Sequence, residues 1–89
     1  MIQRTLPIIN KLGLHARAAS KLVSLASAYE SEVTLARDGQ RVSGKSIMGV
    51  MMLGASRGTE LELHVEGSDE EEAASAICEL VEDRFGEGE

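Results

Sequence analysis

One stretch of the chain, Gly13-Leu14-His15-Ala16-Arg17-Ala18-Ala19, combines residue types that could do chemistry on an anionic group. His15 stands where a loop is expected to end and an alanine-rich helix to begin. The first turn of a helix offers backbone N–H groups without intrahelical acceptors and a partial positive charge. Arg17 adds a full charge, and a neutral imidazole is a good nucleophile toward phosphorus. The sequence therefore predicts that His15 is the working residue.

Length and composition restrict the class of protein. The 89 residues suit one small domain, residues 1–89, whose folding hides about 60% of the unfolded surface. The formal charge of -6 argues against a nucleic-acid partner, and a single cysteine, Cys78, excludes an internal disulfide framework. We expect no metal and no cofactor. With no leader and no long apolar run in the sequence, we expect a cytoplasmic monomer that does not insert into a membrane.

Apolar periodicity predicts the elements that position His15. Alternation predicts strands over residues 2–9 and 60–66, and Pro7, which cannot donate to a ladder, places the first strand at a sheet edge. Spacing of three and four residues predicts an amphipathic helix over residues 16–29.

A hairpin and a short helix are expected in the middle of the chain. Asp38-Gly39 is a strong signal for a two-residue turn, and such a turn places Leu35 opposite Val42. Ser46 is a candidate N-cap for a short helix over the apolar residues 47–53.

The C-terminal part of the chain carries helix signals. Ser68 and Glu71 have the spacing of a capping box at the start of a long helix. Arg84 suits the last turn of that helix and Gly86 its C-terminal cap, which leaves residues 87–89 as a frayed tail. The element order predicts an α+β open-faced sandwich, a four-stranded antiparallel sheet covered on one face by two long helices and one short helix.

Two segments together resemble the signatures of the histidine-containing phosphocarrier protein (HPr) family of the phosphotransferase system. They are Gly13-Leu14-His15-Ala16-Arg17 and Lys45-Ser46-Ile47-Met48-Gly49-Val50-Met51. The similarity in length and element order extends along the chain. It implies an HPr-like fold with strand order 1-4-2-3, in agreement with the edge position inferred from Pro7.

The resemblance implies a phosphocarrier with a transient phosphohistidine rather than an enzyme with its own released product. His15 would accept the phosphoryl group at Nδ1 from phospho-Enzyme I, which is charged by phosphoenolpyruvate, and pass it to a IIA protein or domain. Arg17 would pair with the phosphoryl oxygens, and the backbone amides of Ala16 and Arg17 would help to hold them.

Ser46 has a structural interpretation, as the N-cap, and a regulatory one. The resemblance implies phosphorylation of Ser46 by an HPr kinase/phosphorylase, which would alter the surface that partners meet. Four apolar residues near Ser46 exceed what one buried face of so short a helix can take, so some must be exposed. The resemblance implies that partners dock on Ile47, Met48 and Met51, with Ala16, Ser20 and Gly54 at the margin.

The chain departs from the family pattern at Ala18, where proline is usual, and we expect the chemistry to survive this change. Asn10-Lys11-Leu12-Gly13 favours the nitrogen-related branch of the family, whereas Ser46 is equally at home in sugar-linked carriers. His64 is interpreted as a solvated side chain on the polar face of its strand, and Cys78 as a small packed one.

Two functions from other classes are also compatible with the sequence. One is an interaction module that binds partners through the Ile47–Met52 patch while His15 is idle, although the pairing of His15 with Arg17 argues against it. The other is a small phosphatase, but no second catalytic carboxylate or water-positioning group stands near His15 in the sequence.

Overall fold

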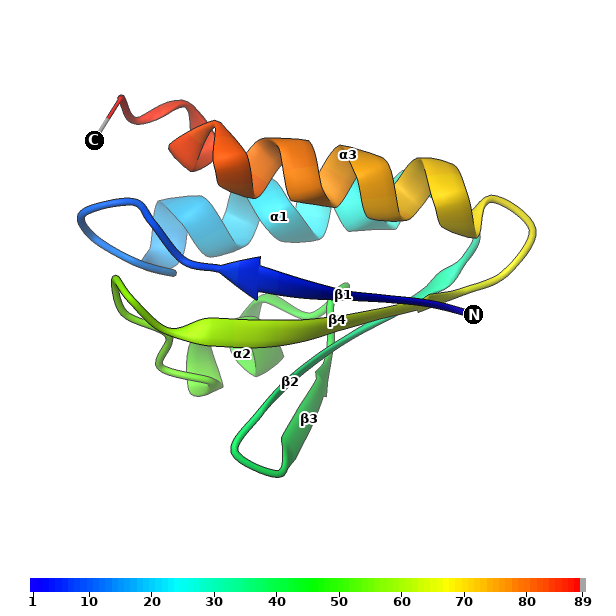
Figure 1. Cartoon of the computed structure of the whole chain (residues 1–89), viewed down its shortest axis with the longest axis horizontal. Helices are drawn as coiled ribbons and strands as arrows, with labels where there is room; N and C mark the ends of the chain where they lie inside the picture. The colour runs from blue at the N-terminus through cyan, green and yellow to red at the C-terminus, as the bar shows by residue number, and fades with distance from the viewer. Residues whose placement is uncertain (89) are drawn as a thin grey trace.

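The computed structural model describes residues 1–88. Its elements are β1 (Ile2–Pro7), α1 (Ala16–Ser27), β2 (Glu32–Arg37), β3 (Gln40–Ser43), α2 (Ile47–Met52), β4 (Glu60–Glu66), α3 (Glu70–Glu82) and the 3-10 helix η1 (Arg84–Gly86). The strands form an antiparallel sheet in the order β1-β4-β2-β3, and α1 and α3 lie side by side over one face (Figure 1). The predicted fold class and strand order are confirmed. None of the helices within residues 1–88 is long and apolar enough to cross a membrane.

The strand register follows the sequence signals closely. Arg37 pairs with Gln40 across the two-residue turn, and Leu35 pairs with Val42 as predicted. Asp38 and Gly39 both have positive φ, 49° and 81°, as this kind of hairpin turn requires. β1, which contains Pro7, pairs only with β4 and forms an edge of the sheet.

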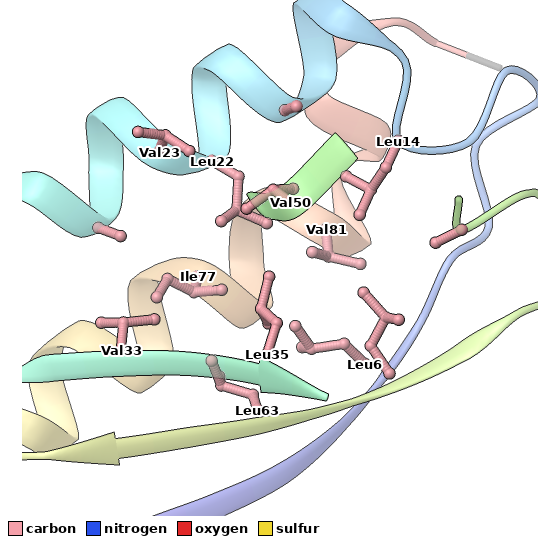
Figure 2. Close-up of a cluster of buried hydrophobic side chains, with 14 of the residues drawn as sticks. Leu6, Leu14, Leu22, Val23, Val33, Leu35, Val50, Leu63, Ile77 and Val81 are labelled. Carbon is pink, nitrogen blue, oxygen red and sulfur yellow. The ribbon is translucent and has the colours of Figure 1, made fainter. Parts of the chain in front are cut away.

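An aliphatic core lies between the sheet and the helices (Figure 2). The inward residues of β4 alternate strictly, with Leu61, Leu63 and Val65 fully buried. One aromatic side chain, Phe85, joins this core at 1% exposure although it follows α3. The core therefore anchors the segment after α3, at Phe85, as well as the sheet.

β1 and α1 are each two residues shorter than predicted, and α2 ends one residue before the predicted limit at residue 53. β1 ends at Pro7, and the next residue, Ile8, donates its N–H to Thr59 O in the loop before β4 (2.8 Å). α1 ends at Ser27 rather than at Tyr29, because the N–H of Tyr29 bonds only three residues back, to Ala26 O (3.2 Å). This tighter turn redirects the chain toward β2.

The predicted capping box of Ser68 and Glu71 is wrong. The Ser68 hydroxyl instead donates to a Glu30 carboxylate oxygen (3.2 Å), and Asp69 occupies the N-cap position of α3. The Asp69 carboxylate accepts the backbone N–H groups of Glu30 and Ser31, both at 2.9 Å. Asp69 thus ties the loop after α1 to the start of α3, a use that the local sequence pattern does not reveal.

The predictions for Arg84 and Gly86 are also wrong, because α3 ends earlier, at Glu82. Arg84 and Phe85 take left-handed φ values of 54° and 56°, which break the helix and turn Phe85 into the core. Gly86, with φ of 77°, ends the short helix η1 and does not cap α3.

Truncation of Leu63 tests the core. Leu63→Ala removes a fully buried side chain at the centre of the sheet, and we expect the free energy of unfolding to fall by about 3 kcal/mol. Urea denaturation measures the loss. Leu12→Ala is the control, since Leu12 is 65% exposed and its truncation should change stability by less than about 0.5 kcal/mol. Equal effects of the two variants would contradict this placement of the core.

Asp69 should give the fold a dependence on acid. The hydrogen bond from the Ser31 hydroxyl, followed by that from the Glu30 N–H, lowers the pKa of the Asp69 carboxyl. Since the pKa of an unfolded aspartate is about 3.9, these bonds stabilise the fold above that pH and are lost as the pH falls below it. We expect Asp69→Asn to be less stable than the parent near neutral pH, with the difference shrinking toward about pH 3. Urea titrations at both pH values measure it, and a difference independent of pH would refute the role given to the carboxylate.

Candidate functional site

His15 is the N-cap residue of α1, as the sequence predicts. Its backbone is extended (φ -74°, ψ 176°), and its side chain accepts no hydrogen bond from the helix. The first N–H of the helix to find an acceptor is that of Ala19, which bonds to His15 O at 2.9 Å. Within the described part of the chain, the N–H groups of residues 16–18 therefore have no hydrogen-bond partner. Ala16 and Arg17 are exposed, so their N–H groups form an open donor pair beside the imidazole, whereas Ala18 is fully buried.

The turn before His15 is tightly fixed. Gly13 has φ of 65°, and a Cβ at this position would lie 2.6 Å from Ala55 O, so the chain requires glycine here. Leu14 donates its N–H to the same carbonyl at 2.9 Å. The amide of Asn10, which is fully buried, donates to Gly13 O at 2.8 Å. The backbone that carries His15 is thus held from two sides.

A hollow on the surface opens beside the imidazole. It is lined by Lys11, Leu12, His15, Arg17, Lys21, Gly86 and Glu87. Three of these residues are cationic and one is a carboxylate, although the whole chain carries a formal charge of -6. Arg17 is exposed, and its guanidinium makes no hydrogen bond or ion pair with any residue from 1 to 88. The local excess of positive charge suits an anionic ligand.

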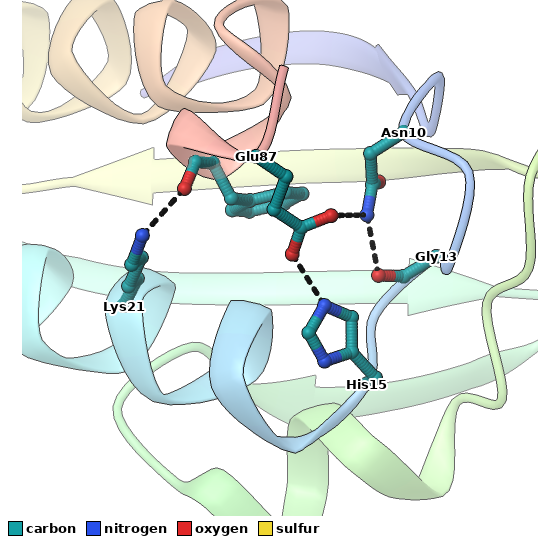
Figure 3. Close-up of polar contacts among 6 residues, drawn as sticks. Asn10, Gly13, His15, Lys21 and Glu87 are labelled. Atoms are coloured by element: carbon teal, nitrogen blue, oxygen red, sulfur yellow. Dashed lines mark hydrogen bonds and ion pairs between the residues drawn. The ribbon is translucent and has the colours of Figure 1, made fainter. Parts of the chain in front are cut away.

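Glu87 is the residue of this site that the sequence prediction missed. One oxygen of its carboxylate contacts Nε2 of His15, and the other accepts the Asn10 amide at 3.0 Å (Figure 3). The prediction of a frayed tail is wrong for Glu87, whose side chain is only 15% exposed; Glu89 lies outside the described residues. A glutamate 72 residues from His15 gives no local signal, so only the fold reveals the contact.

The environment of Glu87 favours its ionised form. Burial acts to raise the pKa of the carboxyl, but the hydrogen bonds from Asn10 and His15 outweigh it. Electrostatic interactions with His15 and Lys21 act in the same direction as the hydrogen bonds, and the net result is a lowered pKa of the Glu87 carboxyl. With Nε2 of His15 occupied by this carboxylate, Nδ1 is the ring nitrogen that points away from Glu87 (Figure 3).

The second predicted segment forms α2, and Ser46 caps it. Ser46 Oγ accepts the backbone N–H of Gly49 at 3.1 Å, which confirms the predicted N-cap. The Ser46 residue is exposed. Its hydroxyl therefore stabilises the helix and stays within reach of solvent.

α2 exposes most of its apolar side chains, as predicted. Val50 and Leu53 are buried, whereas four residues are 43% to 76% exposed; we call these the α2 surface: Ile47, Met48, Met51 and Met52. α2 packs against α1, and the three predicted marginal residues are also exposed: Ala16, Ser20 and Gly54. The predicted apolar surface is thus present on α2.

His64 and Cys78 lie away from this site. The His64 side chain is only 11% exposed, less solvated than predicted, because Gln3 Nε2 contacts its Nδ1 at 3.2 Å. Cys78 is half-buried, and burial raises the pKa of its thiol, as suits a packed side chain. Among residues 1–88 no group of three or more His, Cys, Asp or Glu side chains is placed to hold a metal ion.

Comparison with known proteins gives one consistent result. Residues 2–83 match the family model described as the PTS HPr component phosphorylation site. The chain is 54% identical to the phosphocarrier protein HPr of Cupriavidus necator and 52% identical to that of Neisseria meningitidis serogroup A, each over the full length of both chains. The structure of HPr-C-His from Thermoanaerobacter tengcongensis superimposes with a TM-score of 0.95 at 47% identity, covering 98% of each chain.

The family model covers both predicted signature segments, and the relatives match this chain over its full length. The solved structure shares the fold that positions them. The chain therefore belongs to the HPr family of phosphocarrier proteins of the phosphotransferase system.

Proposed function

We propose that this protein accepts a phosphoryl group from phospho-Enzyme I on Nδ1 of His15 and passes it to a IIA protein or domain. The observation that carries the proposal is the position of His15, at an uncapped helix start beside a hollow rich in cations. A carrier of this kind needs no cofactor and releases no product of its own. Its donor and acceptor are proteins, and it works as a monomer in the cytoplasm without a nucleic-acid partner.

The donors around His15 suit a phosphoryl group. The N–H groups of Ala16 and Arg17 would meet its oxygens, and the Arg17 side chain, which has no other partner among residues 1–88, would pair with its charge. Ala18 keeps a backbone N–H that a proline would lack, but the residue is fully buried, so the donor pair remains that of Ala16 and Arg17.

Partners would dock on the α2 surface, with Ala16, Ser20 and Gly54 at its margin. Methionine side chains are flexible and polarisable, which suits a surface that must bind several proteins in turn. The same exposed surface also favours the alternative of an interaction module in which His15 is idle. The two functions differ in whether His15 becomes phosphorylated.

Phosphorylation of His15 is the direct test. Incubated with phosphoenolpyruvate and Enzyme I, the protein should acquire phosphate that is labile in acid and stable in alkali, because phosphorus is bonded to nitrogen. His15→Ala should acquire none, and Arg17→Ala should be labelled roughly tenfold more slowly because one charged donor is lost. His64→Ala is the matched control, since it removes a histidine outside the site and should be labelled like the parent.

The other outcomes of this experiment identify the alternatives. An unlabelled parent protein would refute the carrier function and leave the interaction module. Steady release of free phosphate during turnover would instead favour a phosphatase.

Ser46 would be a second phosphorylation site, used by an HPr kinase/phosphorylase. A phosphate on Ser46 would lie at the start of α2, beside the α2 surface, and would change what partners meet. Downstream acceptors in sugar transport or in nitrogen regulation would both be affected by such a change.

Ser46→Ala separates the structural role from the regulatory one. Loss of the bond to Gly49 N–H should lower the free energy of unfolding by about 1 kcal/mol, measured by urea denaturation. In a lysate that holds the kinase, the parent should take up phosphate from ATP and Ser46→Ala should not. Ser24→Ala, which changes an exposed serine of α1, should behave like the parent. Uptake by Ser46→Ala would reject Ser46 as the site.

A further inference from the structure

We propose that Glu87 is a positioning residue that holds the proton of His15 on Nε2 and so keeps Nδ1 free as the nucleophile. The inference rests on the proposed function, because it assigns a role in the reaction of the same histidine. Glu87 lies outside residues 2–83, the part of the chain that the family model matches.

Glu87 is positioned beside His15 by residues 84–87, a segment that we call the C-terminal hook. Arg84 and Phe85 hold left-handed φ values that L residues adopt only when their surroundings enforce them. Phe85 is the anchor, at 1% exposure in the core, and Lys21 Nζ binds its carbonyl oxygen at 2.6 Å. The hook therefore presents the Glu87 carboxylate in one place.

Asn10 fixes the orientation of that carboxylate. Its Nδ2 donates to Gly13 O at 2.8 Å and to Glu87 Oε1 at 3.0 Å, and its Oδ1 is buried without a partner among residues 1–88. Turning the amide over would set Oδ1 against two acceptor oxygens, so only the observed orientation is favourable. Asn10 thus binds one carboxylate oxygen of Glu87, and the other oxygen contacts Nε2 of His15.

The remaining carboxylate oxygen determines where the imidazole proton lies. An ionised carboxylate only accepts hydrogen bonds, so Nε2 of His15 must be the donor in this contact. In a neutral imidazole the other nitrogen then carries the lone pair. Glu87 therefore selects the tautomer in which Nδ1 can attack phosphorus.

The transfer step balances without another reactant. The Nδ1 lone pair of His15 forms the new bond to phosphorus, while the bond from phosphorus to the donor protein breaks and its electron pair leaves with the donor atom. Nε2 keeps its proton, so the ring gains positive charge as the bond forms. The Glu87 carboxylate offsets that charge in place.

Two substitutions at Glu87 distinguish positioning from packing. In Glu87→Gln, the Asn10 amide still requires an oxygen, so the new NH₂ group faces Nε2 of His15 and favours the proton on Nδ1. We expect phosphorylation to slow by roughly tenfold in Glu87→Gln but only threefold or so in Glu87→Ala, which leaves the imidazole unconstrained. A packing role predicts the opposite order, because glutamine keeps the shape of glutamate.

The tautomer can be observed directly in the full chain without any partner protein. Nitrogen-15 NMR of neutral His15 should show a protonated Nε2 and an unprotonated Nδ1 in the parent, with the proton shifted toward Nδ1 in Glu87→Gln. Glu82→Gln removes the same charge from an exposed site at the end of α3 and should match the parent in both measurements.

The outcomes separate this inference from the proposed function. Unchanged nitrogen signals in Glu87→Gln, or a rate above that of Glu87→Ala, would overturn the role of Glu87 while leaving the carrier function intact. Absence of phosphorylation in the parent would overturn the carrier function, and the NMR comparison would still decide whether Glu87 sets the tautomer.

Discussion

The N-cap residue of α1, His15, gives the helix no side-chain cap, and the candidate site depends on that open end. An N-cap serine, threonine, aspartate or asparagine would satisfy one of these N–H groups and stabilise the helix by about 1 kcal/mol. His15 occupies the N-cap position without doing so. α2 is the contrast within the same chain, because Ser46 closes its first turn with a bond to Gly49 N–H. The chain thus gives up local stability at one helix start and keeps it at the other, and His15 stands at the open one.

An uncapped helix start is useful only if it stays in place, and the surrounding loops provide that rigidity. Gly13 allows the backbone to pass within contact of Ala55, and the buried Asn10 amide binds both Gly13 O and Glu87. The cations of the hollow add a local field to a chain whose net charge is negative. Since exposed charges farther apart than about 8 Å are largely screened at physiological ionic strength, the nearby cations outweigh the distant acidic surface for a bound anion.

The sequence predicts the structure correctly where the signal lies within a few residues. It fails where a polar side chain forms a hydrogen bond with a residue distant in the chain. The alternation of β4, the turn at Asp38-Gly39 and the Ser46 cap each involve neighbours within a few residues, and the structure confirms them. The Ser68 capping box failed because the N–H groups after α1 bind Asp69, 38 residues or more away, and so fix the start of α3 differently. Glu87 was missed for the same reason, since its partner lies 72 residues earlier.

A phosphoryl carrier must release its cargo as readily as it accepts it, and the charges around His15 suit that requirement. In the proposed function, the open N–H groups and Arg17 would favour the phosphorylated state, whereas the Glu87 carboxylate would bring a negative charge close to an incoming anion. That carboxylate lies on the Nε2 side of the ring, opposite Nδ1. It would therefore lie closer to the positive charge of the ring than to the phosphoryl oxygens on Nδ1. It would therefore stabilise the positive charge that the ring carries once Nδ1 is bonded to phosphorus, and nitrogen is a better leaving group from such a charged ring than from a neutral one. The contact that we propose to keep Nδ1 free for attack on phosphorus would thus also ease the departure of the phosphoryl group to the next protein.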